Sequence, residues 1–203
     1  MKIRIAKVED AEKLVDIYKY YVENTDITFE YDVPSVEEFA GRIRNTLKKY
    51  PYLVAEEELQ GSKDKCADSI GKCGSENDEE RRNTIVGYAY AGPFKSRRAY
   101  DWSVETSIYV KHGLSGKGVG TMLYNELEKY LKKQNIINVN ACITYPNDKS
   151  IGFHEKFGYK KAAHFNKCGY KFGKWRDMIW MERIIGEHVD NPHEVIPFPD
   201  IIK

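Results

Sequence analysis

The most constraining feature of this sequence is a run of alternating glycines, Gly116, Gly118 and Gly120, between a strand pattern and a helix pattern. Residues 103–111, which precede it, alternate in character and are rich in β-branched side chains, as is typical of a strand. From Val119 onward, apolar residues recur every three or four positions, which predicts an amphipathic helix. A strand, a glycine turn and a helix often bind a phosphate through backbone N–H groups. The alternative is a tight turn without a ligand.

Two well-known phosphate fingerprints do not fit this turn. A Walker A loop requires G-x-x-x-x-G-K-[ST], but Lys111 stands in the place of the first glycine and Gly118 in that of the Ser or Thr. A dinucleotide-binding loop requires G-x-G-x-x-G, and Thr121 or Leu123 occupies its last position. What remains is G-x-G-x-G leading directly into a helix. This pattern lets backbone amides approach a pyrophosphate at the positive end of the helix dipole.

The elements around the turn predict an α/β fold with a mixed central β-sheet and helices on its faces. Strand patterns cover 2–8, 52–58, 84–93, 103–111, 137–144, 160–173 and 175–183. Helical patterns start at Ala11, at Val36 behind a capping box of Ser35 and Glu38, at Val119, and just after Pro146. The expected buried face of the helix after the turn consists of Val119, Met122, Leu123, Leu127, Tyr130 and Leu131.

One domain is predicted for residues 1–186, with a polar insertion at about 58–83 and a C-terminal tail at 187–203. The insertion joins two strands that we expect to be antiparallel neighbours, and it is far longer than a hairpin requires. It contains Cys66 and Cys73, which are interpreted as exposed thiols because a zinc site needs more ligands at closer spacing. The tail contains prolines and has little periodicity, so we expect an appendage.

Charge and hydropathy limit the partners. The 32 Lys and Arg residues nearly balance the 31 Asp and Glu residues, which argues against a general nucleic-acid binder. No apolar run approaches the roughly 20 residues needed to span a membrane, and the start of the chain lacks a long apolar signal core. We therefore expect a cytoplasmic protein with free thiols, no metal, and no nucleic-acid or membrane partner.

The turn and its flanks resemble the GCN5-related N-acetyltransferase (GNAT) superfamily. Its acyl-CoA loop reads [QR]-x-x-G-x-[GA], which fits residues 115–120 except that Ser115 replaces the Gln or Arg. A second signature, N-x-x-[SA]-x-x-x-[HY]-[EK]-x-x-G-[FY], fits residues 147–159. The blocks TFEYDVPSVEEF, VGYAYAGPFKSRRAYDWSVETSIYV and GYKFGKWRDMIWMER resemble the phosphinothricin N-acetyltransferase-like subfamily. The resemblance extends from residue 1 to about 183 and implies the GNAT fold, with helices on both faces of the sheet.

The resemblance implies that acetyl-CoA is the cosubstrate. It places the pyrophosphate on Ser115, Gly116, Lys117, Gly118, Val119, Gly120 and Thr121, although Lys117 can equally be a solvated lysine. Asn147 is expected to bond the pantetheine arm, to cap the helix, or both, and Ser150 is assigned to the same site. At the end of the preceding strand the assigned residues are Tyr109, Val110 and Lys111, with a backbone N–H near Val110 meeting the thioester carbonyl.

Two residues are candidates for acid–base chemistry. Glu105 lies on an otherwise β-branched strand, against strand preference, and the resemblance implies that it is the base that deprotonates the amine. The alternative for Glu105 is a structural ion pair. The resemblance links His154 to the reaction centre as an acid or as an organiser of hydrogen bonds. The alternative for His154 is a histidine on a helix face that bonds a nearby carbonyl.

Cys142 raises a rival mechanism through an acetyl-cysteine intermediate. It shares a predicted strand face with Asn140 and Thr144, and no histidine is close to it in sequence. A buried core cysteine is therefore expected, with direct transfer in a ternary complex.

The resemblance implies an acceptor of the phosphinothricin or methionine sulfone type, which carries an α-amine and an anionic or sulfone-like group. Expected substrate-binding residues are Lys95, Arg97 and Arg98, which suit an anion, and Phe29 and Tyr31, which come from a segment that covers the cleft in relatives. The alternative for the cations is a solvated loop. Two other functions stay open, a protein or peptide N-acetyltransferase and a non-catalytic acyl-CoA-binding module. A homodimer is also implied.

Overall fold

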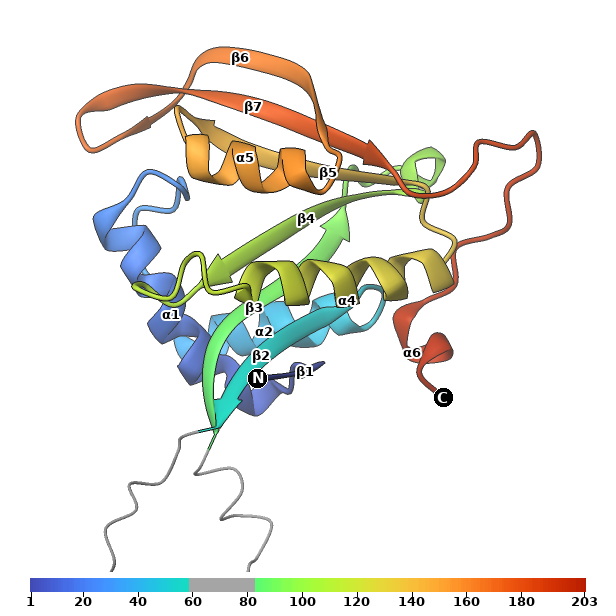
Figure 1. The fold of residues 1–203 in the computed structure, drawn as a ribbon, viewed down its shortest axis with the longest axis horizontal. Coiled ribbons are helices and arrows are strands. Elements are labelled where there is room, and N and C mark those ends of the chain that lie inside the picture. The colour runs from blue at the N-terminus through green and yellow to red at the C-terminus, as the bar shows by residue number, and fades with distance from the viewer. Residues whose placement is uncertain (59–82) are drawn as a thin grey trace, which may run out of the picture.

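The computed structural model describes residues 1–58 and 83–203, which fold around one sheet with strand order β1-β2-β3-β4-β5-β7-β6 (Figure 1). The strands are β1 (Lys2–Ile5), β2 (Tyr52–Glu58), β3 (Asn83–Pro93), β4 (Ser103–Val110), β5 (Asn138–Tyr145), β6 (Lys160–Lys171) and β7 (Lys174–Ile184). The helices are α1 (Ala11–Asn24), α2 (Val36–Leu47), α4 (Val119–Lys133), α5 (Asp148–Lys156) and α6 (Phe198–Ile201), with short 3-10 turns η1 (Val8–Asp10) and η2 (Arg98–Tyr100). The predicted α/β class with a mixed sheet is confirmed.

The sheet is mixed because β4 and β5 run parallel, whereas every other pair of neighbouring strands is antiparallel. The parallel pairing joins only Ser103–Glu105 to Asn138–Asn140. Beyond it, β4 stays paired with β3 through Val110, and β5 stays paired with β7 through Tyr145. The two strands therefore separate after Glu105, as Figure 1 shows.

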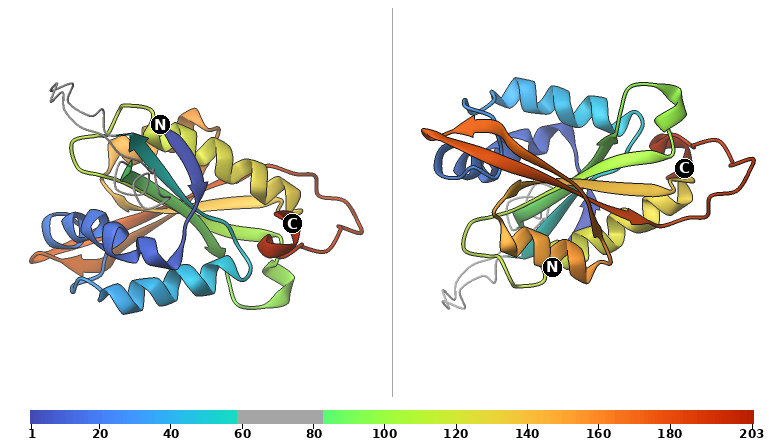
Figure 2. Two further views of the ribbon diagram at one scale, coloured as in Figure 1. Left: turned by 90° about the horizontal axis from the view of Figure 1, so that it is seen from below. Right: turned by 90° about the horizontal axis from the view of Figure 1, so that it is seen from above.

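Helices cover both faces of the sheet, and each face has its own apolar core (Figure 2). On one face, Leu14 of α1 and Ile43 of α2 pack against the β2–β3 region. On the other face, Leu123 and Leu127 of α4 pack with residues of β2 to β5. Side chains of β4 alternate between these two environments, so neighbouring residues of that strand face different helices.

The predicted buried face of α4 is wrong at Met122, which is 38% exposed, and it omits Tyr124, which is 4% exposed. At 3.6 residues per turn, Val119, Leu123 and Leu127 form a stripe that drifts slowly around the helix. Leu131 extends the stripe to within about 20° of Tyr124, whereas Met122 lies about 60° beyond its other edge, at Val119. The helix therefore brings a phenol to the core face.

The C-terminal segment packs against the domain, in contrast to the expected appendage. Phe198 is fully buried against Tyr130 of α4, with ring centroids 5.2 Å apart. The Phe198 N–H donates to the carbonyl of Lys49, and the Ile196 N–H donates to the carbonyl of Gln134. Periodicity did not reveal this packing because only a few residues of the segment contribute to it.

Candidate active site

The glycine turn connects β4 to α4 with left-handed backbone at Gly113, Gly116 and Gly118, where φ is +84°, +83° and +84°. Side chains are strained in this conformation, so glycine is the residue that suits these positions. The turn is exposed at Ser115 and Lys117. Successive amides in such a turn form a concave surface that attracts anions.

The N-terminus of α4 adds further free donors. Gly118 is the N-cap and has no side chain to bond the helix amides, and the first bond inside the helix is from Met122 N–H to Gly118 O, at 3.0 Å. The amides of Val119, Gly120 and Thr121 therefore have no acceptor within the helix. These donors and the helix dipole suit a phosphate.

Gly120 is required by packing rather than by its dihedral angles. A Cβ at this position would lie 3.1 Å from the Phe153 ring and 3.3 Å from Ile108 Cδ1. The start of α4 can therefore approach both β4 and α5 closely.

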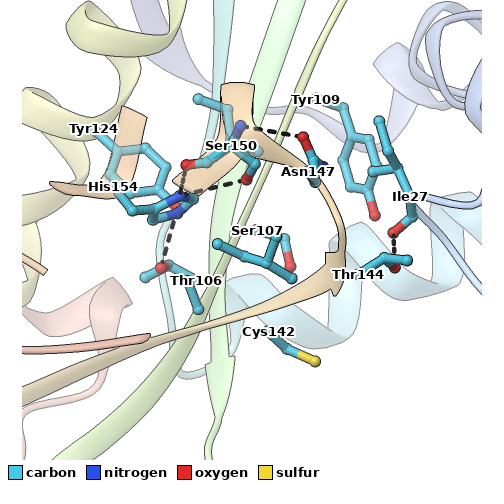
Figure 3. A pocket seen from close by; sticks show the side chains of 13 residues that line it. Ile27, Thr106, Ser107, Tyr109, Tyr124, Cys142, Thr144, Asn147, Ser150 and His154 are labelled. Carbon is cyan, nitrogen blue, oxygen red and sulfur yellow. Dashed lines mark hydrogen bonds between the residues drawn. The ribbon is translucent and has the colours of Figure 1, made fainter. Parts of the chain in front are cut away.

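A pocket of about 60 Å³ occupies the gap where β4 and β5 separate (Figure 3). Ser107 and Tyr109 of β4 and Cys142 and Thr144 of β5 line one side of it. Its other side is lined by Thr106 of β4, Tyr124 of α4, the α5 N-cap Asn147, and Ser150 and His154 of α5. The gap therefore connects the two faces of the sheet.

Glu105 lies on the α1–α2 face of the sheet, at the last paired position before the strands separate. It is half-buried, and burial raises the pKa of its carboxyl group above the usual 4.5, while the charge of Lys95 acts in the opposite direction. Lys95 Nζ lies 5.1 Å from the Phe94 ring centroid and 5.7 Å from that of Trp180. Glu105 is thus a carboxylate with increased basicity beside a cation.

His154 lies on the opposite face and is 3% exposed. Its Nδ1 is 2.8 Å from the carbonyl oxygen of Ser150, and its Nε2 is 3.0 Å from the hydroxyl of Tyr124. Burial lowers the pKa of the imidazole, and the hydrogen bond to Ser150 opposes this shift. Both ring nitrogens therefore contact protein atoms, which leaves neither of them directed at a free ligand position.

The contacts continue beyond His154 as a buried chain. The Tyr124 hydroxyl donates to Thr106 Oγ1 at 3.2 Å, and Thr106 Oγ1 donates to the carbonyl of Asn140 at 3.1 Å. The Tyr159 hydroxyl is 3.4 Å from Thr106 Oγ1. The chain links α5, α4, β4 and β5 at the pocket wall (Figure 3).

Cys142 lines the pocket from β5, and its thiol lies 2.7 Å from Met178 Sδ of β7. Burial and the nearby Glu105 charge raise the pKa of this thiol to about 12. A thiol of this kind is protonated at neutral pH and is a weak nucleophile. Cys142 is only partly buried, belongs to neither apolar core and lines the pocket, so the expectation of a buried core cysteine is wrong.

Asn147 caps α5, because its Oδ1 accepts a hydrogen bond from the Ser150 N–H at 3.1 Å. Both residues also line the pocket. The Ser150 hydroxyl lies 3.5 Å from His154 Nδ1, so it contributes only a weak contact there. The cap therefore leaves the Asn147 amide nitrogen available to a ligand.

The end of β4 carries the other residues assigned to the cofactor. Tyr109 lines the pocket, and Lys111 is exposed, with its N–H donating to Val86 O at 2.8 Å. The Val110 N–H donates to the hydroxyl of Tyr21 at 3.3 Å, and that hydroxyl donates to Val110 O. The amide that was assigned to the thioester is therefore engaged by a residue of α1.

Residues 26–31 lie between the pocket and the hairpin of β6 and β7. Ile27 lines the pocket, and its carbonyl accepts a hydrogen bond from Thr144 at 3.5 Å. The buried Lys171 donates to Thr28 O at 2.8 Å, and the Tyr31 hydroxyl donates to Tyr170 O. Phe29 packs on Gly169, where a Cβ would lie 2.4 Å from its ring.

The expected substrate-binding cations occupy different environments. All three cations are exposed, but the charge of Lys95 acts on Glu105, whereas within residues 1–58 and 83–203 neither Arg97 nor Arg98 has an ion-pair partner. Phe29 is half-buried and Tyr31 is 66% exposed. Cys66 and Cys73 lie outside the described residues.

These features match a known family model, which describes an acetyltransferase (GNAT) domain and matches residues 3–66 and 77–180. The chain belongs to the GNAT acetyltransferase family. The resemblance inferred from the glycine turn and the Asn147–Tyr159 signature is confirmed. As a GNAT protein, the chain is an acetyl-CoA-dependent N-acetyltransferase.

Several GNAT relatives match along most of the chain. The phosphinothricin N-acetyltransferase of Streptomyces viridochromogenes is 32% identical over 183 residues, which cover 90% of this chain and 87% of the relative. The L-methionine sulfoximine/L-methionine sulfone acetyltransferase of Pseudomonas paraeruginosa is 28% identical and covers 89% and 92%. The crystal structure of a phosphinothricin acetyltransferase from Sinorhizobium meliloti in complex with AcCoA is 30% identical, with a TM-score of 0.80 and coverage of 97% and 96%.

Sequence reasoning missed several residues of the candidate site. Tyr124, Thr106 and Tyr21 were not assigned to it, although Tyr124 precedes Leu127 and Leu131 at helical spacing, which is a usable signal. Thr106 and Tyr21 gave no comparable signal because their contacts are distant in sequence. Along residues 1–58 and 83–203, every helix is too short or too polar to span a membrane.

Proposed function

We propose that this protein transfers an acetyl group from acetyl-CoA to the α-amine of a small anionic amino-acid-like acceptor, by direct attack in a ternary complex. The observation that carries the proposal is the gap between β4 and β5. It places a basic carboxylate, Glu105, on one face of the sheet and the enclosed His154 on the other. An acyl donor and an amine that enter from different faces can meet there.

The donor site is built for a pyrophosphate followed by an extended arm. The pyrophosphate binds the amides of Gly116 to Thr121, where left-handed glycines and the α4 N-terminus supply donors. The pantetheine arm lies in the gap and takes the place that a neighbouring strand would have beside β4. Asn147 and Ser150 are positioned along this wall to bond its amides.

The thioester carbonyl binds near the end of β4. The Lys111 N–H points to β3, so strand alternation directs the N–H groups of Val110 and Ile108 into the gap. The bond from Val110 N–H to Tyr21 is long, at 3.3 Å, and the thioester oxygen replaces Tyr21 as its acceptor. Such a donor stabilises the oxyanion that develops during transfer.

Glu105 deprotonates the acceptor amine. A free α-amine is largely protonated near neutral pH, so attack requires a base. Burial raises the pKa of the Glu105 carboxyl group, which increases its basicity, while the charge of Lys95 opposes this shift. The high pKa of the Cys142 thiol, about 12, argues against an acetyl-cysteine intermediate.

The acceptor assignment rests on the named relatives and on the cover over the pocket. Two relatives are named for phosphinothricin and for methionine sulfoximine or sulfone. Hydrogen bonds from Thr144 of β5 and Lys171 of β6 hold residues 26–31 against β5 and the β6–β7 hairpin. A segment that is held over the pocket favours a small acceptor over a peptide, because a peptide needs an open groove.

The experiment is a thiol-release assay with acetyl-CoA and a panel of phosphinothricin, methionine sulfone, methionine sulfoximine, free amino acids and short peptides. Turnover confined to the small anionic acceptors supports the proposal, and preferred turnover of peptides would replace it. Retained acetyl-CoA binding without turnover of any amine would favour a non-catalytic acyl-CoA-binding module.

The double variant Arg97→Ala/Arg98→Ala tests the acceptor cations. We expect it to raise the KM for the acceptor well above its effect on the KM for acetyl-CoA, because arginines bind carboxylate and phosphinate in a bidentate manner. Equal effects on both KM values would count against this assignment.

A further inference from the structure

The chain of contacts from Ser150 to Asn140 contains fewer hydrogens than it needs when His154 is neutral. The contacts are His154 Nδ1 to Ser150 O, His154 Nε2 to Tyr124 OH, Tyr124 OH to Thr106 Oγ1, and Thr106 Oγ1 to Asn140 O. Both ends are carbonyl oxygens, which only accept. Each hydroxyl supplies one hydrogen and a neutral imidazole supplies one, so one contact lacks a hydrogen.

A proton on His154 completes the chain. In the imidazolium, Nδ1–H donates to Ser150 O and Nε2–H donates to the Tyr124 oxygen. The Tyr124 O–H then donates to Thr106, and the Thr106 O–H donates to Asn140 O. In the neutral form with Nδ1 protonated, Nε2 accepts from Tyr124, so the contact with Thr106 or that with Asn140 loses its hydrogen.

We propose that Tyr124 is a positioning residue for acetyl transfer, whose hydroxyl turns between His154 Nε2 and Thr106 Oγ1 and so allows the enclosed imidazole to hold a proton. This role rests on the proposed function. Transfer from a thioester to an ammonium group forms an amide and a thiol and releases one net proton. Of the two protons that leave the nitrogen, one goes to sulfur and the other to solvent. During this transfer the imidazole of His154 can hold a proton temporarily.

The surroundings of His154 leave Tyr124 as the group that can perform this task. The titratable side chains packed against the imidazole are Tyr124 from α4 and Tyr159 at the end of α5, with ring centroids at 5.5 Å and 5.1 Å. The Tyr159 hydroxyl contacts Thr106 but not the imidazole. Glu105, on the other sheet face, influences Tyr124 only through its charge. Phe153 contributes an apolar ring.

The test is the titration of His154 by NMR in the protein without ligands, in wild type and in Tyr124→Phe. The variant keeps the ring contacts and removes the hydroxyl, so a protonated Nε2 would be buried without a partner. Because a hydrogen bond to a charged group is stronger than one to a neutral group, we expect the His154 pKa to fall by about one unit. We also expect kcat to fall about tenfold, with the acetyl-CoA KM within about twofold of wild type.

A matched control and a second variant separate this role from simple packing. Tyr130→Phe removes a hydroxyl from the same helix, far from His154, and should leave the titration and kcat unchanged. Thr106→Val removes the acceptor of the Tyr124 hydrogen bond while keeping the branched shape. It should lower the His154 pKa in the same direction by a smaller amount, and it carries the test if Tyr124→Phe does not fold.

An unchanged or raised His154 pKa in folded Tyr124→Phe would overturn the proposal, and so would an unchanged pKa in Thr106→Val. A lower melting temperature with an unmoved titration would show a packing role only. The titration needs no acceptor, so it still tests the hydroxyl chain if the thiol-release assay finds no substrate.

Discussion

Glu105 lies on one face of the sheet at the last paired position before the gap, whereas His154 lines the gap from the other face, and their surroundings differ in kind. Glu105 is half-buried beside the charged Lys95, and burial raises its pKa. His154 is enclosed among hydroxyls, a carbonyl and aromatic rings, and burial lowers its pKa. In both cases burial favours the neutral form. Only Glu105 has a nearby charge of opposite sign, that of Lys95, which opposes the effect of burial.

Because their surroundings differ, we expect Glu105 and His154 to have different roles in catalysis. A base must take a proton from each incoming amine and release it to solvent, which suits a carboxylate at a partly open position. A histidine whose two nitrogens already contact protein atoms acts through its neighbours instead of on the reactants. The comparison therefore predicts a hierarchy of effects when each residue is changed.

The largest effect is expected for Glu105→Gln. The amide keeps the shape and cannot accept a proton, so we expect kcat to fall about 10²- to 10⁴-fold, with smaller changes in both KM values. Steady-state kinetics with saturating acetyl-CoA measures this. Wild-type activity should also be lost as the pH falls through the raised pKa of Glu105, because the base must be ionised. A variant that keeps more than half of kcat would remove Glu105 from the mechanism.

A smaller loss is expected for His154→Gln. Because the imidazole acts through Tyr124 and not on the reactants, we expect kcat to fall on the order of tenfold, below the effect of losing the general base. The same assay measures it, with circular dichroism to verify folding. A loss of kcat as large as that of Glu105→Gln would contradict the different roles of the two residues, since it would place His154 in direct contact with the reacting atoms.

The variant Lys95→Met tests the difference between Glu105 and His154, because it removes the charge that lies near Glu105 alone. Lys95 lowers the Glu105 pKa, so its loss should move the acidic limb of the kcat profile to higher pH, by up to about one unit. Lys160→Met, at an exposed position of β6 that does not act on the Glu105 pKa, serves as the matched loss of charge and should leave the limb in place. A limb that moves to lower pH would contradict the assignment of that limb to Glu105.

The smallest effect is expected in the free energy of unfolding, where the two residues act with opposite signs. The Glu105 pKa is raised on folding, so its contribution to stability is lost as the pH rises from 4.5 through the folded pKa. The His154 pKa is lowered, so stability is lost as the pH falls below 6.5.

Urea unfolding of Glu105→Gln should show a gain in the free energy of unfolding over wild type at pH 7, and this gain should disappear at acidic pH. Since Glu105 is partly open to solvent, this gain should stay below about 1.4 kcal/mol for each pH unit by which folding raises its pKa. A gain that is the same at every pH would exclude ionisation as its cause.

Local patterns predicted the elements and the cofactor turn well because these depend on neighbouring residues. The left-handed glycines and the strand and helix around them are readable from 103–131 alone. The engagement of Val110 N–H by Tyr21 is not readable, because 89 positions separate the two residues. The same holds for the packing of Phe198 against Tyr130. The homodimer and the cytoplasmic location stay predictions.

The short parallel pairing between β4 and β5 also has a mechanical consequence. Along this seam between the two halves of the sheet, the ladder between β4 and β5 is limited to Ser103–Glu105 and Asn138–Asn140, and two further backbone bonds run from the N–H groups of Ile137 and Asn138 to Trp102 O. A donor molecule lying in the gap contacts both halves and so acts as a crosslink between them. Any ligand that binds the folded state in preference to the unfolded chain raises its stability. Acetyl-CoA should therefore slow amide hydrogen exchange most in β5, β6 and β7, the part of the sheet that this seam connects to the rest of the molecule.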